Sequence, residues 1–72
     1  MAVKADKLII GQRAIIITCS DQQMMDIGFV TGELLKVLQI APFNGPKAVT
    51  IGASTFAVRN EELATVEVQI EE

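Results

Sequence analysis

The side chains that could carry acid–base or nucleophilic chemistry are few in this sequence. Histidine is absent, and Cys19 is the single cysteine. Without a histidine, no serine or thiol has an evident general base beside it. The sequence also lacks a glycine-rich phosphate loop with its lysine. We therefore expect no enzymatic activity, and we expect Cys19 to be a small residue packed near the end of a strand.

The same shortage argues against a built metal site. Soft and borderline metals need cysteine or histidine ligands at short, defined spacings, and no such pair exists. The carboxylates that remain are Asp21, Asp26, Glu33, Glu61 and Glu62. The last two are adjacent, so on a helical turn they point apart and do not chelate one ion together. We read the carboxylates as helix-end charges and solubilising groups, and we expect no resident metal or cofactor.

Four side chains are candidates for contacting a partner protein: Met25, Phe29, Phe43 and Arg59. Methionine adapts to irregular surfaces, and an aromatic ring on a proline-bracketed loop can serve as an exposed anchor. For Met25 and Phe29 the alternative is that they cover the core, and for Phe43 that it closes one end of the fold. Arg59 has two readings as well, an ion pair with the acidic turn that follows it or a contact with a partner's carboxylate.

Composition places the chain among small soluble domains. The sequence has 72 residues, of which 50% are hydrophobic and 21% charged, and its net charge is −3. We expect a single domain over residues 1–72, with residues 1–6 loose. Lysine and arginine are scattered, and tryptophan and tyrosine are absent, which disfavours nucleic acid as a ligand. With neither a signal-peptide core nor a run long enough to span a bilayer, the expected location is the cytoplasm, without membrane insertion.

Extended segments dominate the pattern. Residues 13–19 are rich in β-branched side chains and predict a central strand that is buried on both faces. Residues 7–10 are expected to form an edge segment leading into a turn. Further strands are expected at residues 33–40, 47–51, 55–58 and 66–70.

Two short helical segments complete the expected elements. A helix over roughly residues 21–27 would be capped by Ser20, with Gln23 reaching back to complete a capping box. The glycines of the stretch 28–32 would end that helix and turn the chain. Asn60 can cap a single helical turn before the last strand. About five strands joined by tight turns predict a mainly β fold, a small, partly open barrel, whose exposed apolar strand faces leave self-association open.

Three segments in a fixed order resemble the ferrous iron transport protein A family. They read QMMDIGFVTG at 23–32, APFNGP at 41–46 and FAVRNEELA at 56–64, and the resemblance extends from about residue 8 to residue 68. The family is similar in fold to the SH3-like domain that ends iron-dependent transcriptional repressors. Gln23 stands where the family usually has a basic residue, which removes a charge contact there. Thr31 stands where it often has proline, which loosens a turn.

The resemblance implies a small cytoplasmic accessory of ferrous iron uptake. Such a protein would bind and modulate the cytosolic GTP-binding domain of a membrane ferrous iron transporter, with Met25, Phe29, Phe43 or Arg59 at the contact. Arg59 supplied to that partner could also assist its GTP hydrolysis. The alternative is a metal-responsive regulatory domain related to the repressors' C-terminal domain.

Overall fold

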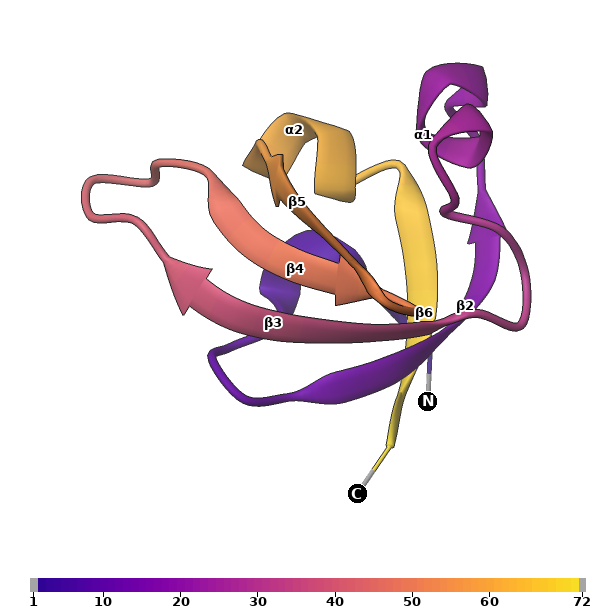
Figure 1. Cartoon of the computed structure of the whole chain (residues 1–72), viewed down its shortest axis with the longest axis horizontal. Coiled ribbons are helices and arrows are strands. Elements are labelled where there is room, and N and C mark those ends of the chain that lie inside the picture. Colours follow the sequence, from indigo (N-terminus) through magenta and orange to yellow (C-terminus); the bar gives the residue numbers. More distant parts are fainter. Residues whose placement is uncertain (1, 72) are drawn as a thin grey trace.

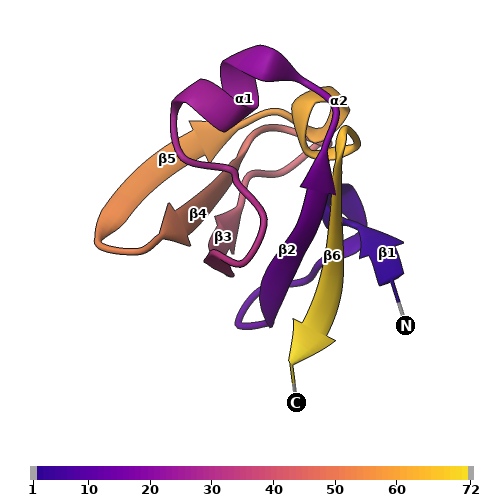
Figure 2. The same cartoon turned by 90° about the vertical axis from the view of Figure 1, so that its right-hand side faces the viewer.

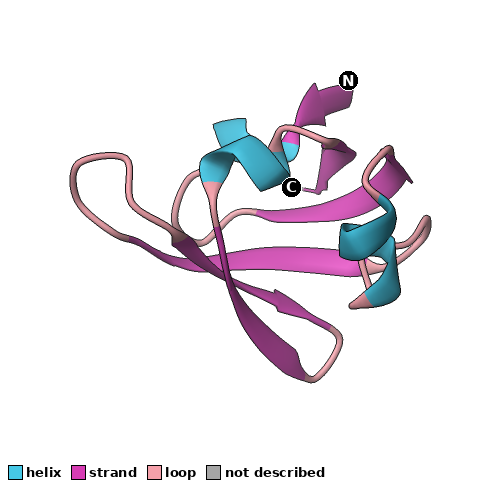
Figure 3. Ribbon diagram, turned by 90° about the horizontal axis from the view of Figure 1, so that it is seen from above, coloured by secondary structure: helices cyan, strands magenta, loops and turns pink. Residues whose placement is uncertain are grey.

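The computed structural model describes residues 2–71 as one antiparallel sheet with two short α-helices, which lie at the top of Figure 1 and on two sides of the molecule in Figure 3. The six strands follow the order β1-β6-β2-β3-β4-β5, and they curl into a partly open barrel. The elements along the chain are β1 (Ala2–Lys4), the 3-10 helix η1 (Ala5–Lys7), β2 (Arg13–Cys19), α1 (Gln22–Asp26), β3 (Leu34–Ile40), β4 (Lys47–Ile51), β5 (Ser54–Val58), α2 (Asn60–Leu63) and β6 (Val66–Glu71).

The predicted strands are confirmed to within a residue or two at their ends. β2 lies between β6 and β3, so the expectation of a central strand is correct. The prediction that both faces of β2 are buried was wrong. Ala14 and Ile16 point into the core and are fully buried, whereas Ile17 is 38% exposed. The reason is that a single curled sheet covers only its inner face, so residues alternate between core and solvent.

The N-terminal segment is not loose, contrary to expectation. β1 pairs antiparallel with β6, with Val3 opposite Val68. Ala5 and Leu8 follow it and are buried in the core. The segment 7–10 is therefore no edge strand: it leaves η1 and enters a loop whose Ile9 and Ile10 are exposed. Residue 1 of the predicted loose segment lies outside the described residues. The sequence pattern predicted five strands, and β1 is the additional strand that it did not reveal.

The cap of α1 is Asp21 rather than the predicted Ser20. The Asp21 carboxylate accepts a hydrogen bond of 2.9 Å from the backbone N–H of Gln23. The Ser20 hydroxyl instead donates to the carbonyl of Thr65, at 3.4 Å. Because the Asp21 carboxylate already accepts the hydrogen bond from the first-turn N–H, the Ser20 hydroxyl can instead bind the segment before β6.

The cap of α2 also differs by one residue from the prediction. Arg59 is its N-cap, and the backbone N–H of Arg59 donates to Glu62 Oε1 at 3.0 Å. Asn60, the expected cap, begins the helix and uses its side chain elsewhere. The capping therefore depends on the acidic residue three positions on, as in a capping box.

The turn between α1 and β3 depends on glycine and on one hydroxyl. Gly28 and Gly32 have φ values of +123° and +93°, and they turn the chain after the helix as the sequence predicted. The Thr31 hydroxyl donates a 2.8 Å hydrogen bond to the carbonyl of Ile17 on β2. Thr31 was expected to loosen this turn, and its side-chain hydrogen bond to β2 instead holds the turn in place.

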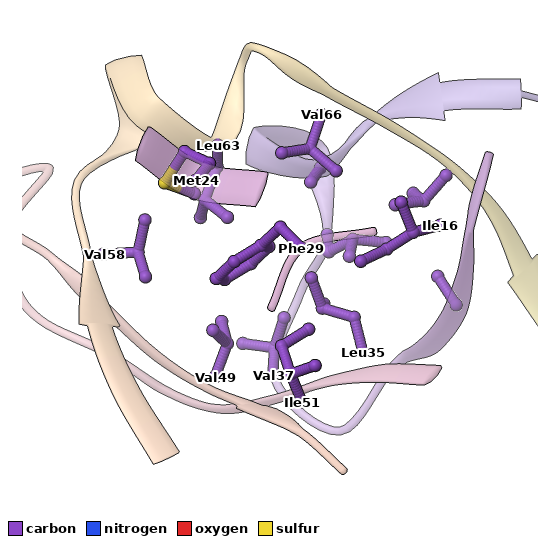
Figure 4. Packing of buried hydrophobic residues seen from close by; sticks show 14 residues of the cluster. Ile16, Met24, Phe29, Leu35, Val37, Val49, Ile51, Val58, Leu63 and Val66 are labelled. Carbon is purple, nitrogen blue, oxygen red and sulfur yellow. The ribbon is translucent and has the colours of Figure 1, made fainter. Parts of the chain in front are cut away.

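Phe29 forms the centre of the core. Its side chain is fully buried, and in Figure 4 its ring lies between residues of β3, β4, β5 and both helices. The Phe29 and Phe56 rings pack at a centroid distance of 5.9 Å and an angle of 52°. α1 contributes Met24 and α2 contributes Leu63, and both side chains are buried in the same core. The two short helices are stable because their apolar side chains close the open end of the barrel over this ring.

Candidate partner-binding site

Phe43 is the most exposed large apolar side chain among the described residues. It lies on the loop between β3 and β4 and is 100% exposed. Its φ is +59°, and the next residue, Asn44, has the same value. Positive φ is costly for a bulky residue because the Cβ approaches the backbone. The two loop residues that take positive φ are Phe43 and Asn44, and the loop glycine that follows them is not one of them.

The loop that carries Phe43 is held in place. The N–H of Ala41 donates to the carbonyl of Pro46, and the N–H of Gly45 donates to the carbonyl of Pro42, both at 3.1 Å. A methyl group at Gly45 would lie only 2.8 Å from the Ala41 Cβ, so the loop closes tightly on itself. These contacts define the loop that presents the exposed ring.

Replacing Phe43 with glycine is expected to stabilise the protein by about 0.5–1 kcal/mol, because glycine removes the strain of positive φ and no packing is lost. The measurement is the midpoint of urea unfolding. Phe43→Ala, which keeps a Cβ, serves as the matched control and is expected to change stability by less than about 0.5 kcal/mol. A glycine variant less stable than the native protein would contradict the strain at this position.

Arg59 belongs to the same end of the molecule as Phe43. The Asn60 side chain donates to the carbonyl of Asn44 at 3.3 Å and so joins the start of α2 to the loop. Phe43 and Arg59 each adjoin one member of this hydrogen-bonded pair. We call the surface formed by Phe43, Asn44, Arg59 and Asn60 the loop–helix face.

The other two candidates lie elsewhere. Phe29 is buried in the core, so the core reading is confirmed for it and its ring is not available to a partner. Met25 is half-buried on α1, and Figure 1 shows α1 on the opposite side of the molecule from the β3–β4 loop. The structure therefore does not bring Met25 and Phe43 into one groove.

Beside the loop–helix face lies an open pocket that the sequence did not reveal. It is formed between η1, the β3–β4 loop and α2, and its lining includes Leu8, Ile40, Asn44, Lys47 and Glu61. Lys47 is 5% exposed, and its ammonium donates to the carbonyls of Asp6 and Leu8, the latter at 3.3 Å. Lysine is rarely buried, so the sequence could not indicate that the first residue of β4 is a buried lysine.

Two of the residues that line this pocket each carry a buried oxygen without a hydrogen-bond partner among residues 2–71. These oxygens are Oδ1 of Asp6 and Oδ1 of Asn60. Unpaired buried acceptors are costly, and small side-chain rotations would let them accept hydrogen bonds from a donor that enters the pocket. The pocket can therefore extend the loop–helix face with hydrogen-bonding capacity.

The part of the chain that the structure describes brings together no three cysteine, histidine, aspartate or glutamate side chains suited to hold a metal ion. Cys19 is half-buried against the core, and its thiol donates to the carbonyl of Asp21 at 3.5 Å.

Within residues 2–71, no helix has the length and apolar character required to cross a membrane.

A protein-family model for the FeoA domain matches residues 4–70. The chain belongs to the FeoA domain family. FeoA proteins are associated with ferrous iron transport, so the resemblance drawn from the three sequence segments is confirmed. No curated protein matches the sequence closely enough to count as a relative.

Solved FeoA structures have the same fold. The iron(II) transport protein A of Clostridium thermocellum is 29% identical and has a TM-score of 0.86; the match covers 94% of this chain and 45% of that one. The Chlorobium tepidum FeoA protein is also 29% identical, with a TM-score of 0.87 and coverage of 97% and 71%. Stenotrophomonas maltophilia FeoA, solved with zinc and described as an SH3 domain protein, is 23% identical, with a TM-score of 0.85 and coverage of 97% and 96%. The fold is accordingly SH3-like.

The fold is also similar to part of a metal-dependent repressor. A manganese-dependent transcriptional repressor is 23% identical, with a TM-score of 0.81; the match covers 94% of this chain and 41% of that one. At this identity the likeness concerns the fold alone. This FeoA chain spans about two-fifths of the repressor's length.

Proposed function

We propose that this FeoA protein is a non-enzymatic cytoplasmic accessory of ferrous iron uptake. Its loop–helix face would bind the cytosolic GTP-binding domain of a membrane ferrous iron transporter and modulate it. Membership of the FeoA family supports the link to iron transport. The observation that carries the binding proposal is Phe43, which is fully exposed and held at positive φ on a hydrogen-bonded loop.

The energetics of Phe43 favour a partner at this position. An exposed aromatic ring at positive φ contributes nothing to folding and costs free energy in the isolated protein. A partner that covers the ring recovers the hydrophobic term, and the two hydrogen bonds within the loop reduce the number of backbone conformations that binding has to order. Aromatic residues and arginine are the residue types that most often dominate interface energies, and Arg59 precedes Asn60, whose side chain is hydrogen-bonded to the loop that carries the ring.

Phe43→Ala is expected to weaken binding to the transporter's GTP-binding domain by about tenfold or more, because loss of a central aromatic anchor costs about 2 kcal/mol. Arg59→Ala is expected to weaken it less. The measurement is titration of the isotope-labelled protein with the purified GTP-binding domain, followed by backbone NMR. Ile17→Ala, a truncation of a partly exposed residue on β2, is the matched control and should bind like the native protein.

Three results would contradict this proposal. One is absence of binding at high micromolar concentration by a folded protein, and another is shift changes confined to surfaces away from the loop–helix face. The third is native affinity in the Phe43→Ala variant.

Shift changes on α1 would instead assign a separate contact to Met25. Unchanged stimulation of GTP hydrolysis by Arg59→Ala would exclude a direct role of Arg59 in that reaction.

The second candidate is a metal-responsive regulatory domain. Fold similarity to the manganese-dependent repressor favours it. The test is thermal unfolding of the isolated protein with ferrous or manganous ion. A stoichiometric, saturable rise in the unfolding temperature would favour metal sensing, whereas a small, non-saturating rise would favour the accessory role.

A further inference from the structure

The outer edge of β5 lacks the features that usually protect an edge strand from pairing. β5 is the last strand in the sheet order and is hydrogen-bonded to β4 on one side. Figure 2 shows it at the border of the sheet, with no strand beyond it. Its sequence, STFAV, contains neither charge nor proline, whereas the opposite edge strand, β1, carries Lys4. An unguarded edge presents free backbone groups to another strand.

The turn that precedes β5 determines which backbone groups are free. Gly52 has a φ of +59°, and Ala53 does not have positive φ, as in a two-residue type II′ turn. Such a turn makes Ile51 and Ser54 a hydrogen-bonded pair, and pairs along the ladder then alternate. Thr55 and Ala57 therefore turn their N–H and C=O groups outward. Among the backbone hydrogen bonds outside the sheet ladder in residues 2–71, none uses these groups.

We propose that two copies of this protein associate by antiparallel pairing of β5 with β5 about a two-fold axis at Phe56. In that register Thr55 of each copy lies opposite Ala57 of the other. Both residues present outward N–H and C=O groups, so four intermolecular hydrogen bonds form. The pairing is isologous and closed, which limits it to a dimer. It does not depend on the proposed transporter partner.

The side chains near the axis are compatible with this register. Phe56 is half-buried and packs on Phe29 from the inner face of β5. The two Phe56 side chains would be cross-strand neighbours on that face, where aromatic pairs are favourable. The outward-facing Thr55 and Ala57 are uncharged, so no like charges oppose each other at the centre.

The charges at the two ends of β5 favour a second copy as the occupant. The register places Arg59 opposite Ala53 of the other copy, next to that copy's Gly52. A methyl group on Gly52 would lie 3.9 Å from Glu33 Oε1, so this carboxylate flanks the turn. The long arginine side chain therefore comes within reach of Glu33 of the other copy, once at each end of the pair.

Within one chain, Arg59 and Glu33 are separated by the length of β5. Five residues at about 3.4 Å each span roughly 17 Å. The two charged groups can therefore meet only between copies, which makes them a specific probe of the pairing.

The test is sedimentation equilibrium of the full chain up to millimolar concentration. The native protein should show an average mass that rises with concentration toward that of two chains. Ala57→Pro removes an outward N–H without touching the ladder to β4, and it should remain monomeric. Ala57→Ser, the matched control, keeps the N–H and should associate like the native protein.

Charge reversal tests the register itself. Arg59→Glu and Glu33→Arg should each weaken self-association by roughly tenfold, because two attractive contacts become repulsive. A mixture of the two variants should recover association, since the mixed dimer restores opposite charges at both ends. Because both sites are exposed, these variants remain decisive if Ala57→Pro does not fold.

Several results would overturn the proposal. They are a native protein that stays monomeric at millimolar concentration, an Ala57→Pro variant that associates normally, single charge variants that associate like the native protein, and a mixture that fails to associate.

Discussion

Replacing Phe29 with alanine is expected to lower the free energy of unfolding by about 3–5 kcal/mol, the usual cost of truncating a buried aromatic side chain. The ring has no exposed surface and is surrounded by side chains from most elements of the fold. Its loss would leave a cavity that short strands and two single-turn helices cannot close without moving. Because a domain of 72 residues sits at the lower end of the usual range of about 5–15 kcal/mol, most of the protein should then be unfolded or molten.

The measurement is urea unfolding followed by far-ultraviolet circular dichroism, and Phe43→Ala provides the control. The two substitutions remove the same ring, but Phe43 is fully exposed, so its truncation should change the unfolding free energy by less than about 0.5 kcal/mol. A cost below about 1 kcal/mol for Phe29→Ala, or equal costs for both variants, would contradict the assignment of Phe29 to the core.

The sequence favoured Phe43 as the exposed anchor but left two readings open for each phenylalanine, and the reason is physical. Phe29 lies in the glycine-broken stretch 28–32, where neither a helical nor a strand period indicates which way a side chain points. Its burial depends on Gly28 and Gly32, which direct the chain back across the open end of the barrel. For Phe43 the two bracketing prolines indicated a loop, but only the structure shows that nothing covers the ring.

The strands were predictable because their signal is local. β-branched residues and alternation mark β2 to β6, and the turns between them carry glycine or proline. β1 has only three residues and pairs with β6 at the other end of the chain. Its order comes from non-local contacts, which composition and period cannot reveal.

The sequence did not predict the helix caps or the pocket correctly, and the reason is again that both depend on contacts between residues far apart in the chain. Ser20 and Asp21 are both good caps, and a contact between Ser20 and the distant Thr65 decides between them. Arg59 and Phe43 were identified singly, but the link between the start of α2 and the loop that carries Phe43 depends on the hydrogen bond between Asn60 and Asn44. Lys47 was read as the start of a strand, which is correct, and its burial follows from the position of η1 above it.

Replacing Lys47 with methionine is expected to destabilise the protein by about 2–4 kcal/mol and to release the N-terminal segment. Methionine keeps the apolar stem, but it leaves the carbonyls of Asp6 and Leu8 without the ammonium donor that both of them bind. Removing a buried charge offsets part of this loss, because the ammonium is desolvated in the native protein. The carbonyls belong to η1 and the residue after it, so the effect should concentrate there.

Hydrogen exchange measured by NMR gives that result a local signature. Amides in the β1–β6 pairing should exchange faster in Lys47→Met by a larger factor than amides in the β3–β4 pairing, because β1 is held beside η1. Lys36→Met is the matched control: Lys36 is exposed on β3, so its substitution should leave both exchange and stability near native values. Native stability in Lys47→Met would mean that desolvation of the ammonium cancels its hydrogen bonds. Uniform acceleration across the sheet would instead mean that Lys47 supports the whole barrel and not only its N-terminal strand.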